Sequence, residues 1–178
     1  MFATSEAEAE MEETPEKYTQ RILGYVEGQQ PLDVLAATAD KLDSLIKGVS
    51  TTELSRRPAP ERWSVSEIAA HLADAEIVSG FRIRFILGAP GSPIIAYDQD
   101  QWVISGHYDR RDPQESVDLF SALRAANLSL LKSLDARQWK HFGVHSERGQ
   151  ESIEHIVRMM AGHDNNHLLQ IDEILRDK

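Results

Sequence analysis

The amino-acid sequence predicts an all-α protein, a bundle of four long helices with a short extra helix at the N-terminus. Apolar residues recur at three- and four-residue steps in four separate stretches, which is the spacing of an amphipathic helix. Each stretch begins at a residue that favours a helix start. No segment has the sustained two-residue alternation that would predict a strand. Long helices joined by long connections favour a bundle.

The N-terminal part divides into a tail and a short helix. Residues 1–16 carry six glutamates and no Lys or Arg, so we expect residues 1–13 to form a flexible acidic tail. The remaining residues, 14–178, are expected to form a single domain. Thr14 and Pro15 can open a short helix as its cap and first residue, and this helix should stop near Gly28.

The long helices follow in order, each with its own start signal. The first should begin at Pro31 and stop at Gly48, and Pro58 makes residues 49–62 a linker. Ser64 and Glu67 have the spacing of a capping box for a second helix that runs to about residue 87. The third should span about 112–134 and the fourth about 152–176, separated by a linker over 135–151.

The connection over residues 88–111 is long for a compact domain, which is typical of a functional loop or a crossover. Two of its aromatic residues, Tyr97 and Trp102, are candidate contacts for a substrate. The alternative for both is packing of the crossover onto the bundle.

Three histidines fall on the apolar faces of two predicted helices. Each residue advances the helix by about 100°, which puts His71 within about 60° of Ile68 on the buried face. The same construction puts His163 and His167 within about 60° of Met160. Because His163 and His167 are four residues apart, both rings can reach one ion.

Buried neutral histidines need partners, because each unsatisfied ring nitrogen costs about 1–3 kcal/mol. A divalent metal would satisfy all three at once, and imidazole suits zinc, nickel, copper or iron. Three protein ligands also leave a coordination position open, as in catalytic sites. The alternative is a set of structural histidines with partners inside the core.

Asp164 has two possible roles, whereas the other polar residues near this pattern are expected at the rim of the core or on the surface. Asp164 also falls on the apolar face of the last helix, where it could orient a histidine or pair with an arginine. Asp74 is expected at the rim of the core. The remaining histidines, His107, His141, His145 and His155, are expected on the surface.

Charge and composition exclude several classes of function. The net charge is −10, which disfavours binding to nucleic acid or to an anionic membrane surface. The absence of cysteine excludes disulfides, thiolate ligands and cysteine nucleophiles. No apolar run reaches the ~20 residues of a membrane span, and the N-terminus does not look like a secretory signal. We therefore expect a cytoplasmic protein without a membrane partner.

Two segments carry a resemblance to a known family. They are W-S-V-S-E-I-A-A-H-L-A-D-A-E, residues 63–76, and A-G-H-D-N-N-H-L-L-Q-I, residues 161–171. Over residues 30–176 the sequence resembles the DinB-like superfamily, with its YfiT-type candidate metal-dependent hydrolases. The resemblance implies an up-down-down-up bundle with a long crossover. It also implies a metal triad that maps onto His71, His163 and His167, with zinc or nickel as the ion.

The resemblance further implies a homodimer and chemistry with a low-molecular-weight thiol, since several members are thiol S-transferases and one relative is a thiol-dependent maleylpyruvate isomerase. The expected function is a metal-dependent thiol S-transferase or hydrolase that acts on a small molecule. Two alternatives stay open. One is a non-catalytic metal-binding stress-response protein, which the lack of an evident general base favours. The other is a dimeric structural bundle with a relict site.

Overall fold

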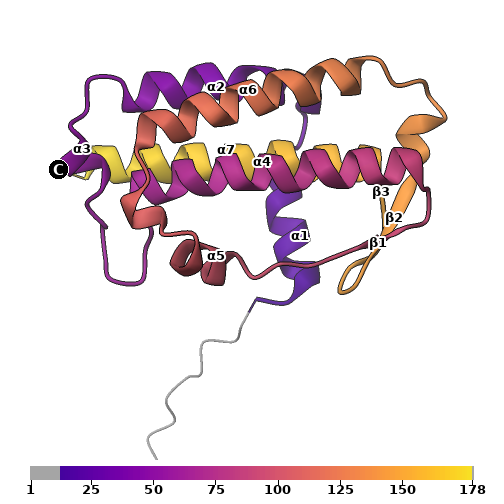
Figure 1. The fold of residues 1–178 in the computed structure, drawn as a ribbon, viewed down its shortest axis with the longest axis horizontal. Coiled ribbons are helices and arrows are strands. Elements are labelled where there is room, and N and C mark those ends of the chain that lie inside the picture. Colours follow the sequence, from indigo (N-terminus) through magenta and orange to yellow (C-terminus); the bar gives the residue numbers. More distant parts are fainter. Residues whose placement is uncertain (1–12, 178) are drawn as a thin grey trace, which may run out of the picture.

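Four long helices lie side by side in two layers (Figure 1). In this computed structural model, which describes residues 13–177, helices α2 (Pro31–Ile46) and α6 (Pro113–Lys132) form one layer. Helices α4 (Val65–Gly88) and α7 (Ile153–Arg176) form the other, and each helix contacts one helix of the opposite layer. The predicted four-helix bundle is confirmed.

The order of helix directions is up, down, down, up (Figure 1). Helices α4 and α6 therefore run parallel, and the chain must return along the length of the bundle between them. This crossover contains strand β1 (Pro93–Ile94), helix α5 (Gln99–Ser105) and the single turn η1 (Tyr108–Arg110).

The helix starts follow the side-chain chemistry that the sequence predicts. Ser64 Oγ accepts the N–H of Glu67 at 3.2 Å, and Glu67 Oε2 accepts the N–H of Ser64 at 2.8 Å, which confirms the capping box of α4. Thr14, Asp112 and Ser152 likewise accept a backbone N–H at the starts of α1 (Pro15–Gly24), α6 and α7.

A small sheet corrects the expectation that the chain has no strands. Strand β1 pairs in parallel with β2 (Phe142–His145), which pairs in antiparallel with β3 (Gly149–Ser152). Strands of two to four residues are too short for alternation to appear in the sequence, and β1 meets β2 only through the fold. The segments expected as linkers also contain helix α3 (Thr51–Leu54) and the turn η2 (Gln138–Lys140).

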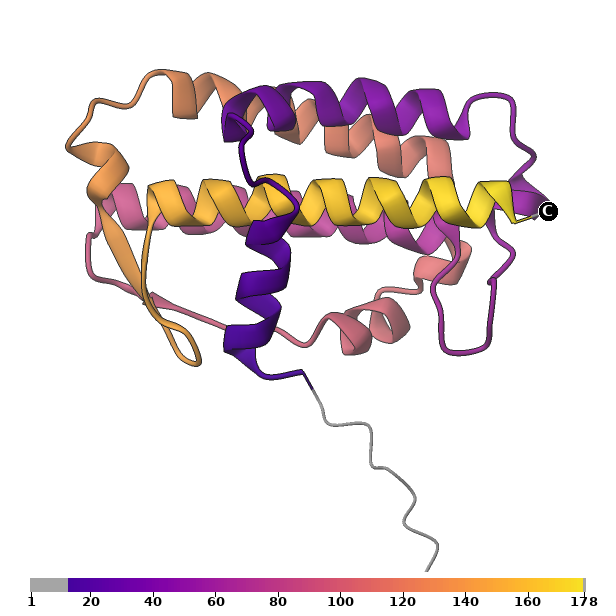
Figure 2. The same cartoon turned by 180° about the vertical axis from the view of Figure 1, so that it is seen from behind.

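Helix α1 lies across α7, on the outer face of the layer that α4 and α7 form (Figure 2). The two helices approach closely at Gly162, where an added Cβ would lie 2.1 Å from the carbonyl oxygen of Ile22. Helix α5 and the sheet lie on the same side (Figures 1 and 2). One outer face of the bundle is thus covered by three peripheral segments, and His163 lies next to the crossing point.

The N-terminal tail expected over residues 1–13 lies outside the described residues except for Glu13. That residue forms an ion pair with Arg21 at 2.8 Å. Within residues 13–177, no helix is long and apolar enough to span a membrane.

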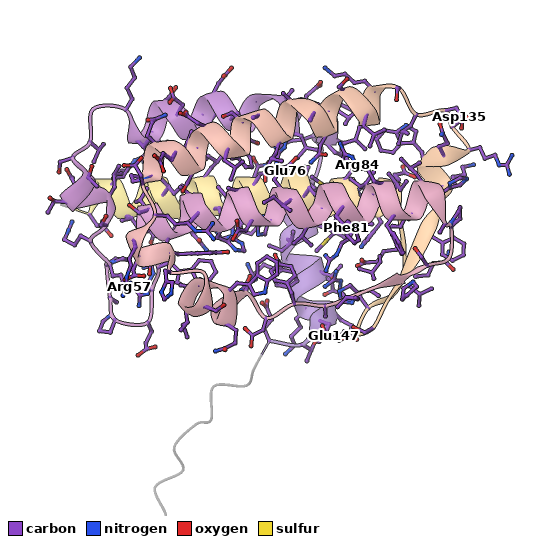
Figure 3. The ribbon with its side chains drawn as sticks, in the orientation of Figure 1. Arg57, Glu76, Phe81, Arg84, Asp135 and Glu147 are labelled. Atoms are coloured by element: carbon purple, nitrogen blue, oxygen red, sulfur yellow. The ribbon has the colours of Figure 1, made fainter. Side chains whose placement is uncertain are left out.

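The bundle core consists of two apolar clusters with polar residues between them. One cluster contains Leu42, Ile68 and Ile171, and the other contains Leu35 and Ile83. Between the clusters, each long helix contributes a buried polar side chain: Thr38, Glu76, Arg124 and Asp164. Figure 3 labels Glu76 between α4 and α6. Polar groups at the centre of a core must find partners there.

Candidate metal centre

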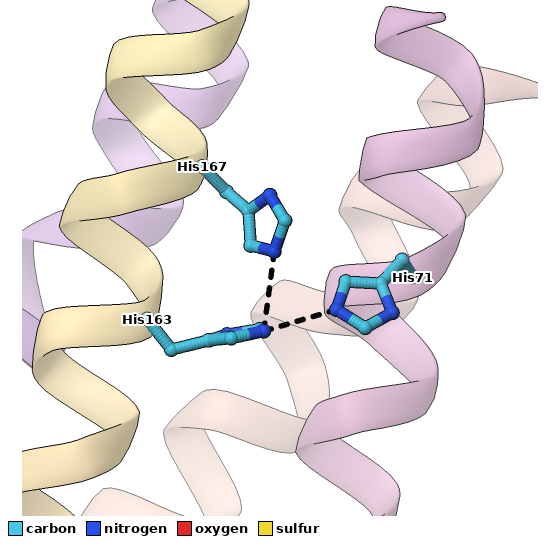
Figure 4. Close-up of side chains that lie close together, drawn as sticks. All are labelled: His71, His163 and His167. Atoms are coloured by element: carbon cyan, nitrogen blue, oxygen red, sulfur yellow. Dashed lines mark hydrogen bonds between the residues drawn. The ribbon is translucent and has the colours of Figure 1, made fainter. Parts of the chain in front are cut away.

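Three histidine rings from two helices converge between α4 and α7 (Figure 4). His71 lies on α4, and His163 and His167 lie one turn apart on α7. The Nε2 atom of His163 lies 2.9 Å from Nε2 of His71 and 3.2 Å from Nε2 of His167. The sequence pattern predicted this set, which we call the histidine cluster.

Burial keeps the histidine cluster uncharged. His71 and His167 are buried, and His163 is partly exposed. Burial lowers the pKa of His71 to about 3 and that of His167 to about 4, and it lowers the pKa of His163 well below its ordinary value. Each ring is therefore neutral near pH 7, with one nitrogen that can accept a proton or bind a metal.

Two neighbours that the sequence analysis missed orient these rings. Gln170 Oε1 lies 2.9 Å from Nδ1 of His167, so that Nδ1 donates a hydrogen bond and Nε2 keeps its lone pair. The Trp63 ring stacks on His167 at 6.3 Å and lies 4.9 Å from the ring of His71. Gln170 follows His167 by three residues on one helix, and this spacing could have identified it.

The donor set fits a divalent transition metal. A tetrahedral ion with metal–nitrogen bonds of about 2.0–2.1 Å separates its ligand nitrogens by about 3.3 Å, close to the two distances in the cluster. All three candidate ligand atoms lie within 4.8 Å of one another. Three nitrogens alone satisfy one another poorly, because His163 Nε2 lies between two partners and can donate only one proton.

Asp164 belongs to a second polar group, the buried charge cluster of Glu76, Arg124 and Asp164. Arg124 donates from Nη1 to Asp164 Oδ2 at 2.6 Å and from Nη2 to Glu76 Oε2 at 2.8 Å. Arg124 Nη1 also donates to the carbonyl of Leu35, and Asn127 donates to Glu76. Of the two interpretations of Asp164, the arginine pair is the one present. Among the described residues, no hydrogen bond joins Asp164 to the histidine cluster.

A pocket of about 300 Å³ opens beside His163, and we call it the α4–α7 pocket. Helix α4 lines it with Leu72, Ala75, Glu76, Ser79 and Arg82, and helix α7 with Ile156, Met159, Met160, His163 and Asp164. Its outer wall comes from Pro15 and Tyr18 of α1, Tyr97 of the crossover, and His145, Arg148 and Glu151 of the hairpin. A second pocket of about 290 Å³ reaches His163 and His167 past Trp63.

The two candidate substrate residues of the crossover differ in position. Tyr97 lines the α4–α7 pocket, and burial raises the pKa of its hydroxyl, which keeps it protonated. Trp102 contacts the ring of Tyr97 at 4.6 Å and packs against the cluster of Ala70, Val103 and Tyr108. Tyr97 is thus placed to contact a ligand, whereas Trp102 packs the crossover onto the bundle.

The remaining histidines and Asp74 depart in part from expectation. His107 is exposed as expected, and His141 and His155 are half-buried. His145, expected on the surface, is buried, because β2 pairs with two other strands and turns this side chain toward the α4–α7 pocket. Asp74 is half-buried, and it accepts hydrogen bonds from Tyr108 and Arg111.

The fold and the cluster together define a helical-bundle protein with a candidate three-histidine metal centre. The chain belongs to the DinB superfamily, whose family model matches residues 35–171. YfiT of Bacillus subtilis strain 168, named as a candidate metal-dependent hydrolase, is 24% identical over 146 residues, which cover 82% of this chain and 82% of YfiT. A similarly named protein of Oceanobacillus iheyensis is 25% identical over 133 residues, 74% of this chain and 76% of that protein.

Two solved structures share the fold. The structure of YfiT from Bacillus subtilis, described as a probable metal-dependent hydrolase with an unusual four-helix bundle topology, matches with a TM-score of 0.76 at 22% identity. The match covers 95% of this chain and 91% of YfiT. A mycothiol-dependent maleylpyruvate isomerase matches with a TM-score of 0.65 at 12% identity, over 79% of this chain and 59% of that protein.

Proposed function

We propose that this protein is a metal-dependent enzyme that holds one divalent ion, zinc or nickel, with His71, His163 and His167. The observation that carries the proposal is the convergence of three neutral Nε2 atoms next to a pocket of about 300 Å³. Such an ion, when bound, lowers the pKa of a water or a thiol in its open position and so supplies a nucleophile near neutral pH. The substrate is a small molecule that fits the α4–α7 pocket.

The surroundings favour thiol S-transfer over hydrolysis. Glu76 and Asp164 line the pocket, but Arg124 binds both of them, so neither is free to accept a proton from water. A thiol has an ordinary pKa of about 8.5 and needs less assistance to ionise than water does. The fold shared with a mycothiol-dependent isomerase supports the same choice, whereas the names of YfiT and its relatives favour hydrolysis. The cytoplasm, where thiols stay reduced, suits this reaction.

The second candidate function is a non-catalytic metal-binding protein, which is favoured because the two buried carboxylates beside His163, Glu76 and Asp164, are both bound by Arg124. This reading and the relict structural bundle require only the histidine cluster, with no ligand in the α4–α7 pocket. A pocket walled by three separate peripheral segments favours the enzyme over both.

A homodimer is part of the proposal. Ile77, Phe81 and Phe85 recur at four-residue steps on α4 and are all exposed, and the rings of Phe81 and Phe85 stack at 5.5 Å. Exposed apolar stripes of this kind are typical of contact surfaces. A second copy of the chain is the proposed partner.

The test of the metal site is elemental analysis of the untagged protein, before and after chelation and reloading. We expect about one zinc or nickel ion per chain, and almost none in His163→Ala. The matched control is His107→Asn, which removes an exposed histidine at a positive φ that asparagine tolerates. Equal metal content in the wild type and His163→Ala would exclude this site.

The test of the reaction is turnover of electrophilic acceptors by the zinc- and nickel-loaded protein, with and without a panel of low-molecular-weight thiols. Thiol-dependent and metal-dependent turnover is the expected result. Turnover without any thiol would favour hydrolysis instead, and no turnover with full metal loading would favour the non-catalytic alternative.

A further inference from the structure

The α4–α7 pocket is lined along α4 from Leu72 to Arg82, and His163 is the member of the histidine cluster that lines it. His71 and Arg82 are eleven residues apart on α4, which puts them within about 20° of one face and about 16 Å apart along the helix axis. Between them, Ala75 and Ser79 line the pocket on the same face. A ligand that reaches both ends must therefore be extended.

Arg82 has no carboxylate partner among the described residues, although it is half-buried in the pocket wall. Its Nη2 donates to the carbonyl of Ile95 at 2.6 Å, and its guanidinium lies 5.7 Å from the centre of the Tyr97 ring. The buried Arg124, by contrast, binds two carboxylates. Burial lowers the pKa of Arg82, because the charged guanidinium loses part of its hydration. An anion beside the guanidinium would offset that loss.

Neutral hydrogen-bond donors surround this end of the pocket. Burial raises the pKa of the Tyr18 and Tyr97 hydroxyls, which therefore stay protonated. Nδ1 of the buried His145 accepts the backbone N–H groups of Glu147 and Arg148, so its proton lies on Nε2. Together these groups can donate to an anion without carrying a second positive charge.

The other charges near Arg82 are mostly compensated. Arg148 binds Glu151 at 2.6 Å, and Glu13 binds Arg21 at 2.8 Å. Glu147 also lines the pocket and is exposed to solvent. One uncompensated arginine with acidic neighbours suits a single negative charge better than the double charge of a phosphate monoester. The flat guanidinium also matches the geometry of a carboxylate.

We propose that Arg82 binds a carboxylate of the substrate or thiol, so that the ligand of this enzyme is an extended molecule with a carboxylate about 8–14 Å from its metal-seeking atom. Leu72, Ile156 and Met160 give the middle of the pocket apolar walls that fit a chain of methylene groups or a similar spacer. The length of the ligand rests on the metal function proposed above, whereas the anion site depends on Arg82 alone.

The test measures dissociation constants by calorimetry for two sets of probes. Zinc-loaded protein receives ω-mercaptocarboxylates of increasing length and mercaptoalcohols of equal length. Metal-free protein receives octanoate and octanol. We expect octanoate to bind about 10- to 100-fold more tightly than octanol. We expect a mercaptocarboxylate to bind more tightly than the mercaptoalcohol of equal length only once its chain is long enough to span the pocket.

Arg82→Met should abolish the preference, and Arg82→Lys should keep part of it because the charge remains. The matched control is Arg84→Met on the same helix, since Arg84 bonds to Gly80 and Asn127 and does not line the α4–α7 pocket. A preference that survives in Arg82→Met overturns the proposal, as does equal binding of octanoate and octanol. If octanoate is preferred but no thiol binds zinc-loaded protein, the anion site stands and the metal function fails.

Discussion

The interior of the bundle holds two neighbouring polar clusters, and they differ in how their groups are satisfied. In the buried charge cluster, Arg124 lies between Glu76 and Asp164, and opposite charges meet at 2.6 and 2.8 Å. In the histidine cluster, three neutral rings turn the same atom, Nε2, toward one point. Arg124 meets two counter-charges within the chain, whereas Nε2 of His163 lies between two other neutral imidazole nitrogens.

The difference shows how neighbouring buried polar groups can be assigned to structure or to function. His163 and Asp164 are adjacent in the sequence and both point into the bundle, yet one faces α4 and the other faces Arg124 on α6. Opposite charges that compensate each other in a core are part of the packed structure, and removal of one partner is costly because it leaves the other charge buried and unpaired. Like groups that converge without a counter-charge indicate a binding site.

The largest expected effect on stability comes from removal of the arginine at the centre of the buried charge cluster. Arg124→Leu leaves two carboxylates in the core without their cation, so we expect the free energy of unfolding to fall by about 3–5 kcal/mol. Urea unfolding at pH 7.5 measures it. The control Arg176→Leu removes an exposed ion pair with Asp172 and should change stability by less than about 1 kcal/mol. An equally small effect for Arg124→Leu would contradict the structural role of this cluster.

Completion of the histidine cluster by metal should stabilise the fold. Zinc at about 1,000 times its dissociation constant adds about 4 kcal/mol to the free energy of unfolding of a protein that binds it only when folded. Thermal unfolding of wild-type protein with and without zinc should show this gain. The gain should vanish in His163→Ala and persist in His107→Asn. A zinc-dependent gain of equal size in His163→Ala would place the ion elsewhere.

Acid should weaken the metal-free protein through the same histidines. Below about pH 6.5 the unfolded chain takes up protons on His71 and His167, whereas the folded chain resists until the pH approaches their lowered pKa values of about 3 and about 4. The free energy of unfolding should therefore fall as the pH drops from 6.5, by about 1–3 kcal/mol at pH 5.5. In His71→Leu, urea unfolding should give a shallower pH dependence, and an unchanged slope would contradict the lowered pKa of His71.

The smallest expected effect concerns a residue that orients the cluster without belonging to it. Gln170→Leu removes the acceptor for His167 Nδ1, and we expect metal affinity to fall by about 10- to 100-fold while the stoichiometry at saturation stays the same. Competition with a chelator measures the affinity. The control is Leu169→Ala, which changes an exposed neighbour on the same helix. If both variants bind metal as the wild type does, Gln170 has no such role.

The sequence was sufficient to predict those features that depend on residue spacing within a single helix. Helix caps such as Ser64 and the turn of each histidine toward the core follow from spacing along one helix. The burial of His145 could not be predicted in this way, because it depends on pairing between β1 and β2, which are distant in the sequence. The partner of Asp164 was equally hidden, since Arg124 lies on another helix and nothing local links the two.

The parallel course of α4 and α6 has a consequence for how this protein could diversify. The topology obliges the chain to pass once along the outside of the bundle, and that passage carries Tyr97 into the wall of the pocket. Changes in the crossover can therefore alter which molecules enter while the two helices that hold the histidines, α4 and α7, stay as they are. In this scaffold the residues of the candidate metal centre and the crossover residues that line the pocket lie on separate segments, so each set can change without the other.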